Sequence, residues 1–357
     1  MRIAIDIREA CRRQLAGKGR WTLGCARELL RRPDVNLTLL ADAPLPPELA
    51  GADSIGFRPG VGWHFSALQW LATARAVYLS PTSCIVPAFA GRKSISAVVL
   101  HDMIAFSREP HDRKAKCIER LLLSRALRRA AVVLSISDAT TREALRRFPT
   151  LSPEHFATVY AGPTCEVLPR RQAPARRIVC IGTLCPRKNQ LRLMRAFQML
   201  PLDLRERTTL TLVGARGWHD EEIVRMAREV QGIEWIGYVD DTSWSSILAE
   251  SSILAFPSLE EGFGLPVLDA FRQGVPVLTS GRSSMREIAG SAALLVDPLD
   301  ERSICAGLHS LLTDSLLCKR LVNEGFERAE KFTWQACVER ILRALKSLNT
   351  RDIMGGL

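Results

Sequence analysis

The sequence of 357 residues lacks any uninterrupted run of eighteen or more apolar residues, so we expect no helix that crosses a membrane. Its opening residues, MRIAIDIREA, do not form a signal peptide, because the apolar run is short and Asp6 and Arg8 interrupt it. We therefore expect a cytoplasmic protein. Short-period repeats and low-complexity tracts are also missing.

Metal and disulfide patterns are missing as well. The ten cysteines form no C-x-x-C pair and no Cys/His cluster at metal spacing, so we expect no metal site. In a cytoplasmic chain they are interpreted as small buried hydrophobic residues. Only the positive charge favours nucleic acid as a partner, since no helix-turn-helix, zinc or aromatic-stacking pattern occurs. We therefore do not expect nucleic acid as a partner.

Negative charge is in short supply, because 38 Asp and Glu against 49 Lys and Arg give a net charge of +11. Residues 1–32 hold nine basic against three acidic residues, and residues 112–147 hold ten against four. This excess favours an anionic partner, either a phosphate-bearing ligand or an acidic membrane surface. A plain solvated surface would explain each charged run as well.

The candidate for membrane contact is the helical segment 113–130. It places the apolar residues Ile118, Leu121 and Leu122 on one face, with arginines around them: Arg120, Arg125, Arg128 and Arg129. Docking of this segment on anionic lipid would hold the protein at the inner face of the plasma membrane.

Strand-like apolar segments alternate with segments of helical spacing, as in RIAIDI before WTLGCARELLRR and IVCIGTL before NQLRLMRAFQML. The alternation stops near residue 162, where GPTCEVLPRRQAPARR holds three prolines and is typical of an interdomain linker. We therefore predict an α/β fold of two doubly wound domains, residues 1–165 and 166–333. Ligands bind such sheets at the carboxyl ends of the strands.

Two loops of the second domain combine glycine with charge. In IGTLCPRKNQL, Arg187 and Lys188 open a helix, where backbone N–H groups and two cations favour a diphosphate; an exposed basic helix start is the alternative. In FPSLEEGFGLPVLDA, the glycines allow close approach of a ligand to the backbone. Glu261 and Asp269 lie eight positions apart, a spacing that can place one carboxylate at the reacting end of a ligand and the other at its hydroxyl-rich part.

These motifs resemble the retaining glycosyltransferase family four, the mannosyltransferase-like group 1 glycosyltransferases of GT-B fold. EGFGLPVLDA is similar to the family's pair of glutamates separated by seven residues. Further segments resemble the family in the expected order: AGKGRWT, VVLHDM, VLSISDATTREALRRF, IGTLCPRKNQLRLMRAF, SSMREIAGSAALLVDPLD and FTWQACVERILRAL. The resemblance spans nearly the whole chain. It implies two Rossmann-like domains that face each other across a cleft, with a helix over 334–357 crossing back to the first.

The resemblance also implies roles for single residues. A nucleotide-sugar donor would bind mostly to the second domain and the acceptor to the first. Arg187 and Lys188 would hold the diphosphate and neutralise the leaving group, so neither a metal nor another cofactor is implied. Glu261 would bind the sugar hydroxyls, His101 would lie beside the transferred sugar, and Asp269 would receive the ribose hydroxyls. Further donor contacts would be Thr183, Gly262, Phe263, Gly264, Leu265 and Glu287, bordered by Ser283 and Ser284. The acceptor or phosphate loop would be Gly17, Lys18, Gly19 and Arg20.

Three positions depart from the family pattern. Asp269 stands where glutamate is usual, and its carboxylate is pulled back by one C–C bond, about 1.5 Å. Thr183 stands where arginine is frequent, and Met285 with Arg286 replace a frequent Leu-Pro pair.

The sequence therefore predicts a retaining, metal-independent hexosyltransferase of cell-surface polysaccharide biosynthesis. The donor expected first is GDP-mannose, with UDP- and dTDP-sugars open, and the acceptor is a glycan or a lipid-linked sugar. The alternative, suggested by Asp269, is a non-catalytic GT-B relative that binds a nucleotide or a partner protein.

Overall fold

The computed structural model describes residues 1–91, 94–106, 113–171 and 176–348. The chain forms two compact units, and it passes from the first to the second after Gly162 and returns at Thr333. The predicted domain limits, 165 and 333, lie close to these positions. The predicted helix over 334–357 is described as α14 (Trp334–Ser347) and belongs to the first unit; residues 349–357 lie outside the described part.

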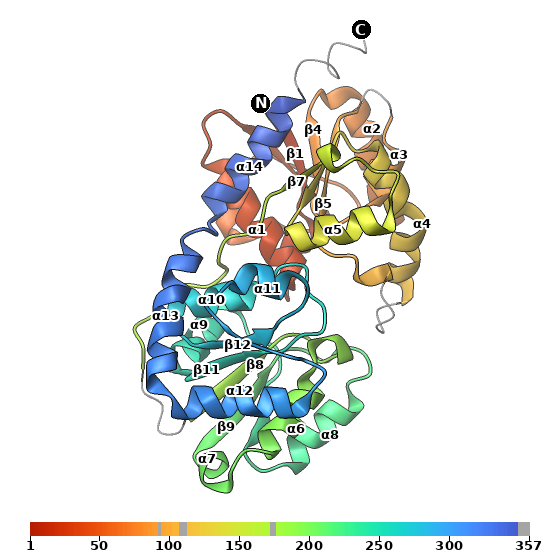
Figure 1. The fold of residues 1–357 in the computed structure, drawn as a ribbon. Coiled ribbons are helices and arrows are strands. Elements are labelled where there is room, and N and C mark those ends of the chain that lie inside the picture. Colours follow the sequence, from red (N-terminus) through yellow and green to blue (C-terminus); the bar gives the residue numbers. More distant parts are fainter. Residues whose placement is uncertain (92–93, 107–112, 172–175, 349–357) are drawn as a thin grey trace. The chain divides into compact units, whose positions relative to one another are not determined.

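A seven-stranded parallel sheet forms the first unit, with the strand order β3-β2-β1-β4-β5-β6-β7 (Figure 1). Its strands are apolar because helices cover both faces of a parallel sheet, and all five residues of β5 are buried. The strands are β1 (Arg2–Asp6), β2 (Asn36–Ala41), β3 (Ser54–Gly56), β4 (Val77–Ser80), β5 (Ser96–Leu100), β6 (Val132–Ser135) and β7 (Phe156–Thr158). The helices are α1 (Gly17–Leu30), α2 (Val61–Ala74), α3 (Ile85–Phe89), α4 (Arg113–Arg129), α5 (Asp138–Arg147) and α14. Short 3-10 turns are η1 (Arg8–Cys11), η2 (Pro47–Leu49), η3 (Ile104–Phe106) and η4 (Pro153–His155).

The second unit holds a six-stranded parallel sheet of order β10-β9-β8-β11-β12-β13. Helices α9, α10, α11 and α13 group on one side of it, and α6, α8 and α12 on the other (Figure 1). The strands are β8 (Arg176–Ile181), β9 (Thr208–Val213), β10 (Ile233–Trp235), β11 (Ile253–Phe256), β12 (Val277–Ser280) and β13 (Leu294–Val296). The helices are η5 (Pro186–Lys188), α6 (Gln190–Gln198), α7 (Leu202–Glu206), α8 (Glu221–Glu229), α9 (Asp241–Glu250), α10 (Leu265–Gln273), α11 (Ser283–Ala289), α12 (Glu301–Thr313) and α13 (Ser315–Ala329).

Both sheets reverse their strand order beside the first strand of the unit. β1 lies between β2 and β4, and β8 lies between β9 and β11, so each unit is doubly wound and Rossmann-like. The α/β prediction is confirmed. The reversal marks the carboxyl ends of β1 and β8 as the places where ligand-binding loops diverge.

Local signals set the limits of two helices. Ser137 caps α5, because its hydroxyl accepts a hydrogen bond from the Thr140 amide. Gly274 ends α10 in a left-handed conformation, with φ of 68°.

Six of the ten cysteines are buried, and all ten are free thiols. The interpretation as buried hydrophobic residues holds for those six but not for Cys117, which is exposed on α4. Within the described ranges, no helix combines the length and apolar character that crossing a bilayer requires.

Candidate functional site

Three segments of the second unit meet at the carboxyl edge of its sheet, after β8, β11 and β12. Gly182 follows β8 with φ of 144°, and a Cβ there would lie 2.9 Å from Lys188 Cε. The glycine therefore makes room for the Lys188 side chain, which passes it toward the loop after β11.

Arg187 and Lys188 converge on one carboxylate, Glu261. The Lys188 Nζ–Glu261 Oε1 distance is 2.6 Å and the Arg187 Nη1–Glu261 Oε1 distance is 3.0 Å. The side chain of Arg187 is 13% exposed, that of Lys188 12% and that of Glu261 10%, so all three are mostly removed from water. Burial would raise the pKa of Glu261, but the two cations outweigh burial and hold the pKa below its usual value. Two cations face one anion, which leaves an excess positive charge in the trio.

Backbone contacts fix this trio. The hydroxyls of Ser283 and Ser284 donate to the Glu261 carbonyl at 2.9 and 2.7 Å. Asn189, in a left-handed conformation, donates from Nδ2 to the carbonyls of Pro257 and Pro298. The loop after β11 is therefore fastened both to η5 and to α11.

The glycine loop leads from Glu261 into α10. Gly264 has φ of 102°, a backbone conformation that side-chain-bearing residues rarely adopt, and the Met285 side chain packs into the space beside it. Phe263 is buried and stacks edge-to-face on Phe332, with 5.6 Å between ring centroids. Leu265 is the first residue of α10. The sequence predicted this loop as a donor contact, and the structure buries the Phe263 ring inside the unit.

Asp269 has a different set of partners from the trio and is 1% exposed. Its Oδ1 accepts hydrogen bonds from the amides of Thr164 at 2.8 Å and Cys165 at 3.4 Å. Its Oδ2 accepts from Thr164 Oγ1 at 2.7 Å and from Trp244 Nε1 at 3.3 Å. Burial raises the pKa of Asp269, although these donors oppose it. The structure thus brings Arg187, Lys188 and Glu261 together but gives Asp269 protein partners, where the sequence predicted ribose.

Two further predicted donor contacts are half-buried. Thr183 follows Gly182, and its carbonyl accepts from Gln190 Nε2 at 3.1 Å. Glu287 lies on α11, and its backbone carbonyl accepts from Arg328 Nη2. Their roles toward a donor stay predictions.

In the first unit, His101 follows β5 and is 8% exposed. Its Nε2 lies 2.7 Å from the Pro81 carbonyl, and Trp21 contacts the ring edge-to-face with 5.5 Å between centroids. Burial, with Lys18 as the next cause, lowers the pKa of His101 to about 4. The imidazole is therefore neutral at pH 7; because a carbonyl only accepts, Nε2 carries the hydrogen and Nδ1 is left as an acceptor.

The predicted loop Gly17 to Arg20 forms the first turn of α1. Gly19 approaches η1 so closely that a Cβ would lie 2.5 Å from the Glu9 carbonyl oxygen. Arg20 Nη1 donates to the Leu15 carbonyl at 2.7 Å, so it stabilises the loop itself. Lys18 Nζ lies 3.4 Å from Glu119 Oε1 on α4.

A recess of about 30 Å³ brings the Lys18 side chain and His101 together at the carboxyl edge of the first sheet. The sequence did not predict three other polar lining residues, Thr82, Ser83 and Glu119, because they are far from α1 in the chain. Asp102 also lines it and accepts from the Ile104 amide at 3.0 Å, the capping role that a residue after a strand often has. Trp21 was given no role in the site from the sequence, yet it contacts His101 edge-to-face.

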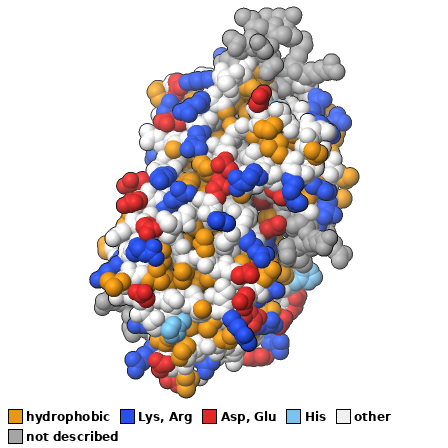
Figure 2. All heavy atoms as spheres, viewed as in Figure 1, with side chains coloured by type: hydrophobic (Ala, Val, Ile, Leu, Met, Phe, Trp, Pro, Cys, Tyr) orange, Lys and Arg blue, Asp and Glu red, His pale blue; other side chains and the backbone are white. Residues whose placement is uncertain are grey.

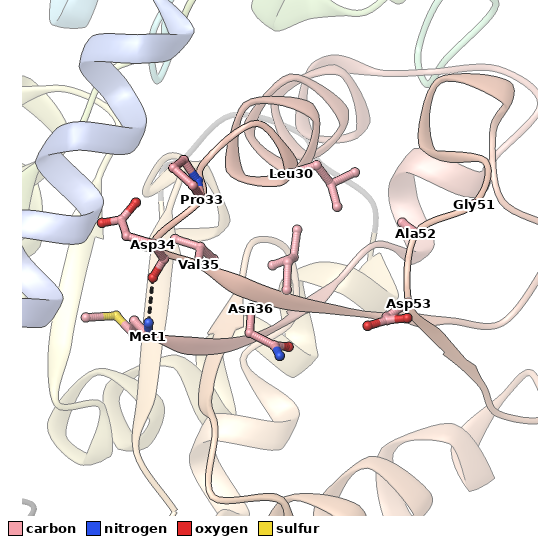
Figure 3. Close-up of a pocket in the computed structure, with 10 residues that line it drawn as sticks. Met1, Leu30, Pro33, Asp34, Val35, Asn36, Gly51, Ala52 and Asp53 are labelled. Atoms are coloured by element: carbon pink, nitrogen blue, oxygen red, sulfur yellow. Dashed lines mark hydrogen bonds between the residues drawn. The ribbon is translucent and has the colours of Figure 1, made fainter.

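A larger hollow, of about 580 Å³, opens at the opposite edge of the first sheet (Figure 3). It lies at the amino ends of β1, β2 and β3, and its lining includes Asp34, Asn36 and Asp53. Doubly wound sheets bind their ligands at the carboxyl ends, so we do not assign this hollow to the site.

The surface of α4 differs from the membrane face that the sequence predicted. Arg120, Arg125 and Arg129 donate to the carbonyls of Ala105, Ala88 and Ala90, so these three arginines are engaged within the unit. Ile118 and Leu121 are exposed, as predicted, and Leu122 is only partly buried. On the face drawn in Figure 2, basic side chains are spread among acidic ones and do not form one continuous patch.

Comparisons with known proteins show which family this chain resembles. The family described as Glycosyl transferases group 1 matches residues 175–314, which include Arg187, Lys188 and Glu261. O-antigen chain mannosyltransferase B of Escherichia coli is 31% identical over 271 residues, which are 71% of this chain and 70% of the relative. Serotype-specific mannosyltransferase WbdA of E. coli is 27% identical over 63% of this chain but only 30% of its own length. The structure of Alr3699/HepE of Anabaena in complex with UDP and glucose matches 97% of this chain and 100% of its own, with a TM-score of 0.78 and 17% identity. This last likeness shows the GT-B fold.

Proposed function

Because this chain belongs to the group 1 glycosyl transferases, we propose that this glycosyltransferase moves a hexose from a nucleotide-sugar to a glycan or lipid-linked acceptor of a cell-surface polysaccharide. GDP-mannose is the donor proposed first, since both E. coli relatives are named mannosyltransferases. The transfer is proposed to retain the anomeric configuration.

The observation that carries the proposal is the buried trio of Arg187, Lys188 and Glu261. In the free protein the Glu261 carboxylate forms ion pairs with both Arg187 and Lys188. An incoming diphosphate would replace this carboxylate as the partner of the two cations. Two preorganised cations would then neutralise the charge that develops on the leaving nucleotide, in a site largely closed to water. This role needs no metal ion, and none is proposed. Glu261, displaced from the cations, would accept hydrogen bonds from the sugar hydroxyls.

In the first unit, the neutral His101 supports a binding role. Its free Nδ1 can accept a hydrogen bond from a hydroxyl of the transferred sugar, and its low pKa excludes a general acid at neutral pH. The loop Gly17 to Arg20 lies beside it and is proposed to contact the acceptor.

A peripheral position on an anionic membrane is also proposed, through α4 and its neighbours. Leu121 is 72% exposed on α4, and Phe65 of α2 and Phe89 of α3 are exposed as well. Apolar side chains of this size beside a basic helix suit the boundary between headgroups and acyl chains. The protein would then reach a lipid-linked acceptor from the cytoplasmic side.

The test is turnover of nucleotide-sugars by the purified protein. A thermal-shift screen with GDP, UDP, dTDP and ADP selects the nucleotide, because a ligand that binds the native state raises its midpoint. Release of that nucleotide from its hexose conjugate is then measured for the wild type and for Glu261→Ala. We expect a loss of about 10²-fold or more in the variant. Equal rates would overturn the role of Glu261. Nucleotide binding with no turnover under any donor would instead favour the non-catalytic alternative.

A further inference from the structure

The side chain of Lys188 has an aromatic neighbour as well as an ionic one. Its ammonium nitrogen lies over the ring of Phe256, 4.6 Å from the ring centroid, and 2.6 Å from Glu261 Oε1. Gly182 leaves space for the middle of the same side chain, because a Cβ there would lie 2.9 Å from Lys188 Cε and 3.1 Å from Cδ. The ammonium is therefore contacted both by an anion and by the face of a ring.

Phe256 is held firmly in the second unit. It is the last residue of β11, is 1% exposed, and lies opposite Thr279 of β12 in the parallel pairing. The Thr279 hydroxyl donates to the Phe256 carbonyl at 2.8 Å. Asn189, which follows Lys188, donates from Nδ2 to the carbonyl of Pro257, which follows Phe256, at 3.0 Å. The segments that carry the ammonium and the ring are thus tied together beside the contact.

The two neighbours of the ammonium differ in charge and in freedom to move. Within the described residues, Glu261 is the hydrogen-bond partner of Lys188 Nζ, and in the proposed function it leaves the cations when a diphosphate arrives. Phe256 is uncharged, so it does not compete with phosphate for the charge of Lys188. Because it belongs to a central strand of the sheet, the ring stays in place during this exchange.

The surroundings favour attraction between the ring and the ammonium. The face of an aromatic ring carries partial negative charge and attracts a cation, more strongly where water is excluded. The Lys188 side chain is 12% exposed, so little water screens this contact. A leucine at position 256 would fill much of the same space without offering such a face.

We propose that Phe256 is a positioning residue for the transfer, and that its ring holds the Lys188 ammonium at the diphosphate site after Glu261 has moved to the sugar. The inference rests on the proposed function, because it assumes a donor that carries a diphosphate. Phe256 acts through Lys188 and needs no contact with the donor. Lys188 then keeps its full charge for the leaving group, with no anionic protein partner against it.

The first experiment detects the contact by NMR in the free and in the loaded full-length protein. The chain has eight lysines, so isotope labelling of lysine gives few Cε–H signals, and Lys188→Arg identifies the signal of position 188. The ring current of an aromatic face shifts protons above it upfield. We expect the Lys188 signal to be shifted upfield in the wild type and to stay shifted when GDP or inorganic diphosphate saturates the site. A shift that is absent from the free protein, or lost when diphosphate binds, would overturn the inference.

A second experiment changes the charge distribution of the ring while almost keeping its shape. Phenylalanines that carry one, two or three fluorine atoms at position 256 weaken the negative face stepwise. We expect the affinity for GDP, measured by isothermal titration, to fall at each step and by about tenfold over the series. The matched control is the same series at Phe197, which is fully buried in the core of the same unit. Those proteins should bind GDP as the wild type does.

These measurements separate the inference from the proposed function. If GDP, UDP, dTDP and ADP all fail to bind the wild type, the proposed function fails and the role of Phe256 fails with it. If the wild type binds and every fluorinated Phe256 protein binds equally well, Phe256 only packs in the core and the inference alone is wrong. Phe256→Leu should bind GDP at least as weakly as the most fluorinated protein; should it fail to fold, the fluorinated series still decides.

Discussion

At the scale of single residues, the shared carboxylate of Glu261 explains how two cations can be stored beside each other. Arg187 and Lys188 carry like charges and repel each other. The Glu261 carboxylate, which lies 3.0 Å from Arg187 Nη1 and 2.6 Å from Lys188 Nζ, offsets that repulsion. The free protein supplies that anion itself, and a donor diphosphate would take its place. The pair of cations is thus ready before the ligand arrives, which is the condition for strong electrostatic stabilisation of a leaving group.

Removal of one cation gives a sharp prediction. Lys188→Ala leaves Arg187 alone against Glu261, so the excess positive charge of the trio disappears. We expect kcat for nucleotide-sugar turnover to fall by about 10²–10³-fold, the usual effect of losing one group that stabilises developing charge. Initial rates at saturating donor measure it. Arg195→Ala is the control, because Arg195 pairs with Glu222 and Glu301 on the surface. This variant should turn over nucleotide-sugar at the wild-type rate. A Lys188→Ala rate within threefold of the wild type would contradict the role.

His101 predicts a dependence of stability on pH. Its pKa is lowered by burial to about 4 in the folded chain, against about 6.5 in an unfolded one. The unfolded state therefore binds more protons between these values, so this contribution to stability is complete above pH 6.5 and is lost as the pH falls toward 4. The contribution is about 3 kcal/mol at most, from about 1.4 kcal/mol for each pKa unit.

The measurement compares urea midpoints at pH 7 and pH 4.5. His101→Gln keeps a polar side chain of similar size that does not titrate, so its midpoint should move less between the two pH values than that of the wild type. Parallel shifts in both proteins would show that other groups cause the acid sensitivity.

At the scale of the helices and strands, the sequence predicts where α10 begins and ends but not what its side chains contact. The glycines at 264 and 274 mark its two ends because both need a positive φ. The partner of Asp269 is Thr164, 105 positions earlier in the chain, and no local pattern announces a pairing over that distance. The trio of Arg187, Lys188 and Glu261 could be predicted because each of its members follows a parallel strand, and such strands bring their carboxyl ends to one edge.

Helix α4 shows the same limit. Its span and its basic character follow from the sequence, but the direction of each arginine does not. Long side chains fold back along the helix and reach carbonyls of neighbouring elements, as Arg125 and Arg129 do toward α3. We therefore expect the exposed apolar residues to carry most of any membrane contact.

Liposome co-sedimentation tests this view of α4. Leu121→Asp places a charge where a 72% exposed leucine would enter the interface, so binding to vesicles rich in anionic lipid should fall about tenfold, the equivalent of one buried leucine side chain. Arg125→Ala is the comparison, because Arg125 donates to the Ala88 carbonyl and lies over the Phe89 ring. Arg125→Ala should lower the thermal midpoint, and its vesicle binding should fall less than that of Leu121→Asp. If Leu121→Asp binds like the wild type, α4 does not contact the membrane.

At the scale of the whole molecule, the chain has to return to its first unit after completing the second. The return is fixed by Trp334, the first residue of α14, which enters a slot that two glycines leave open. A Cβ on Gly24 of α1 would lie 2.2 Å from the Trp334 ring, and one on Gly162 would lie 2.5 Å from the Trp334 amide nitrogen. Trp21 contacts the same ring, with 6.2 Å between centroids. The two glycines that accept Trp334 are 310 and 172 positions away in the chain, so the sequence does not predict the slot.

Gly24→Ala tests this docking, because helix propensity and packing predict opposite results. Gly24 lies within α1, where alanine would ordinarily stabilise the helix by up to about 1 kcal/mol. The contact with Trp334 should instead make the alanine variant less stable than the wild type, because overfilling a packed slot costs about 1–3 kcal/mol. Differential scanning calorimetry should therefore show a lower midpoint. Gly62→Ala on α2 is the matched control, since nothing lies within 4 Å of its Cβ position, and its midpoint should stay equal or rise. If both variants are equally stable, α1 yields at the slot, and Trp334 is not what fastens α14 to the first unit.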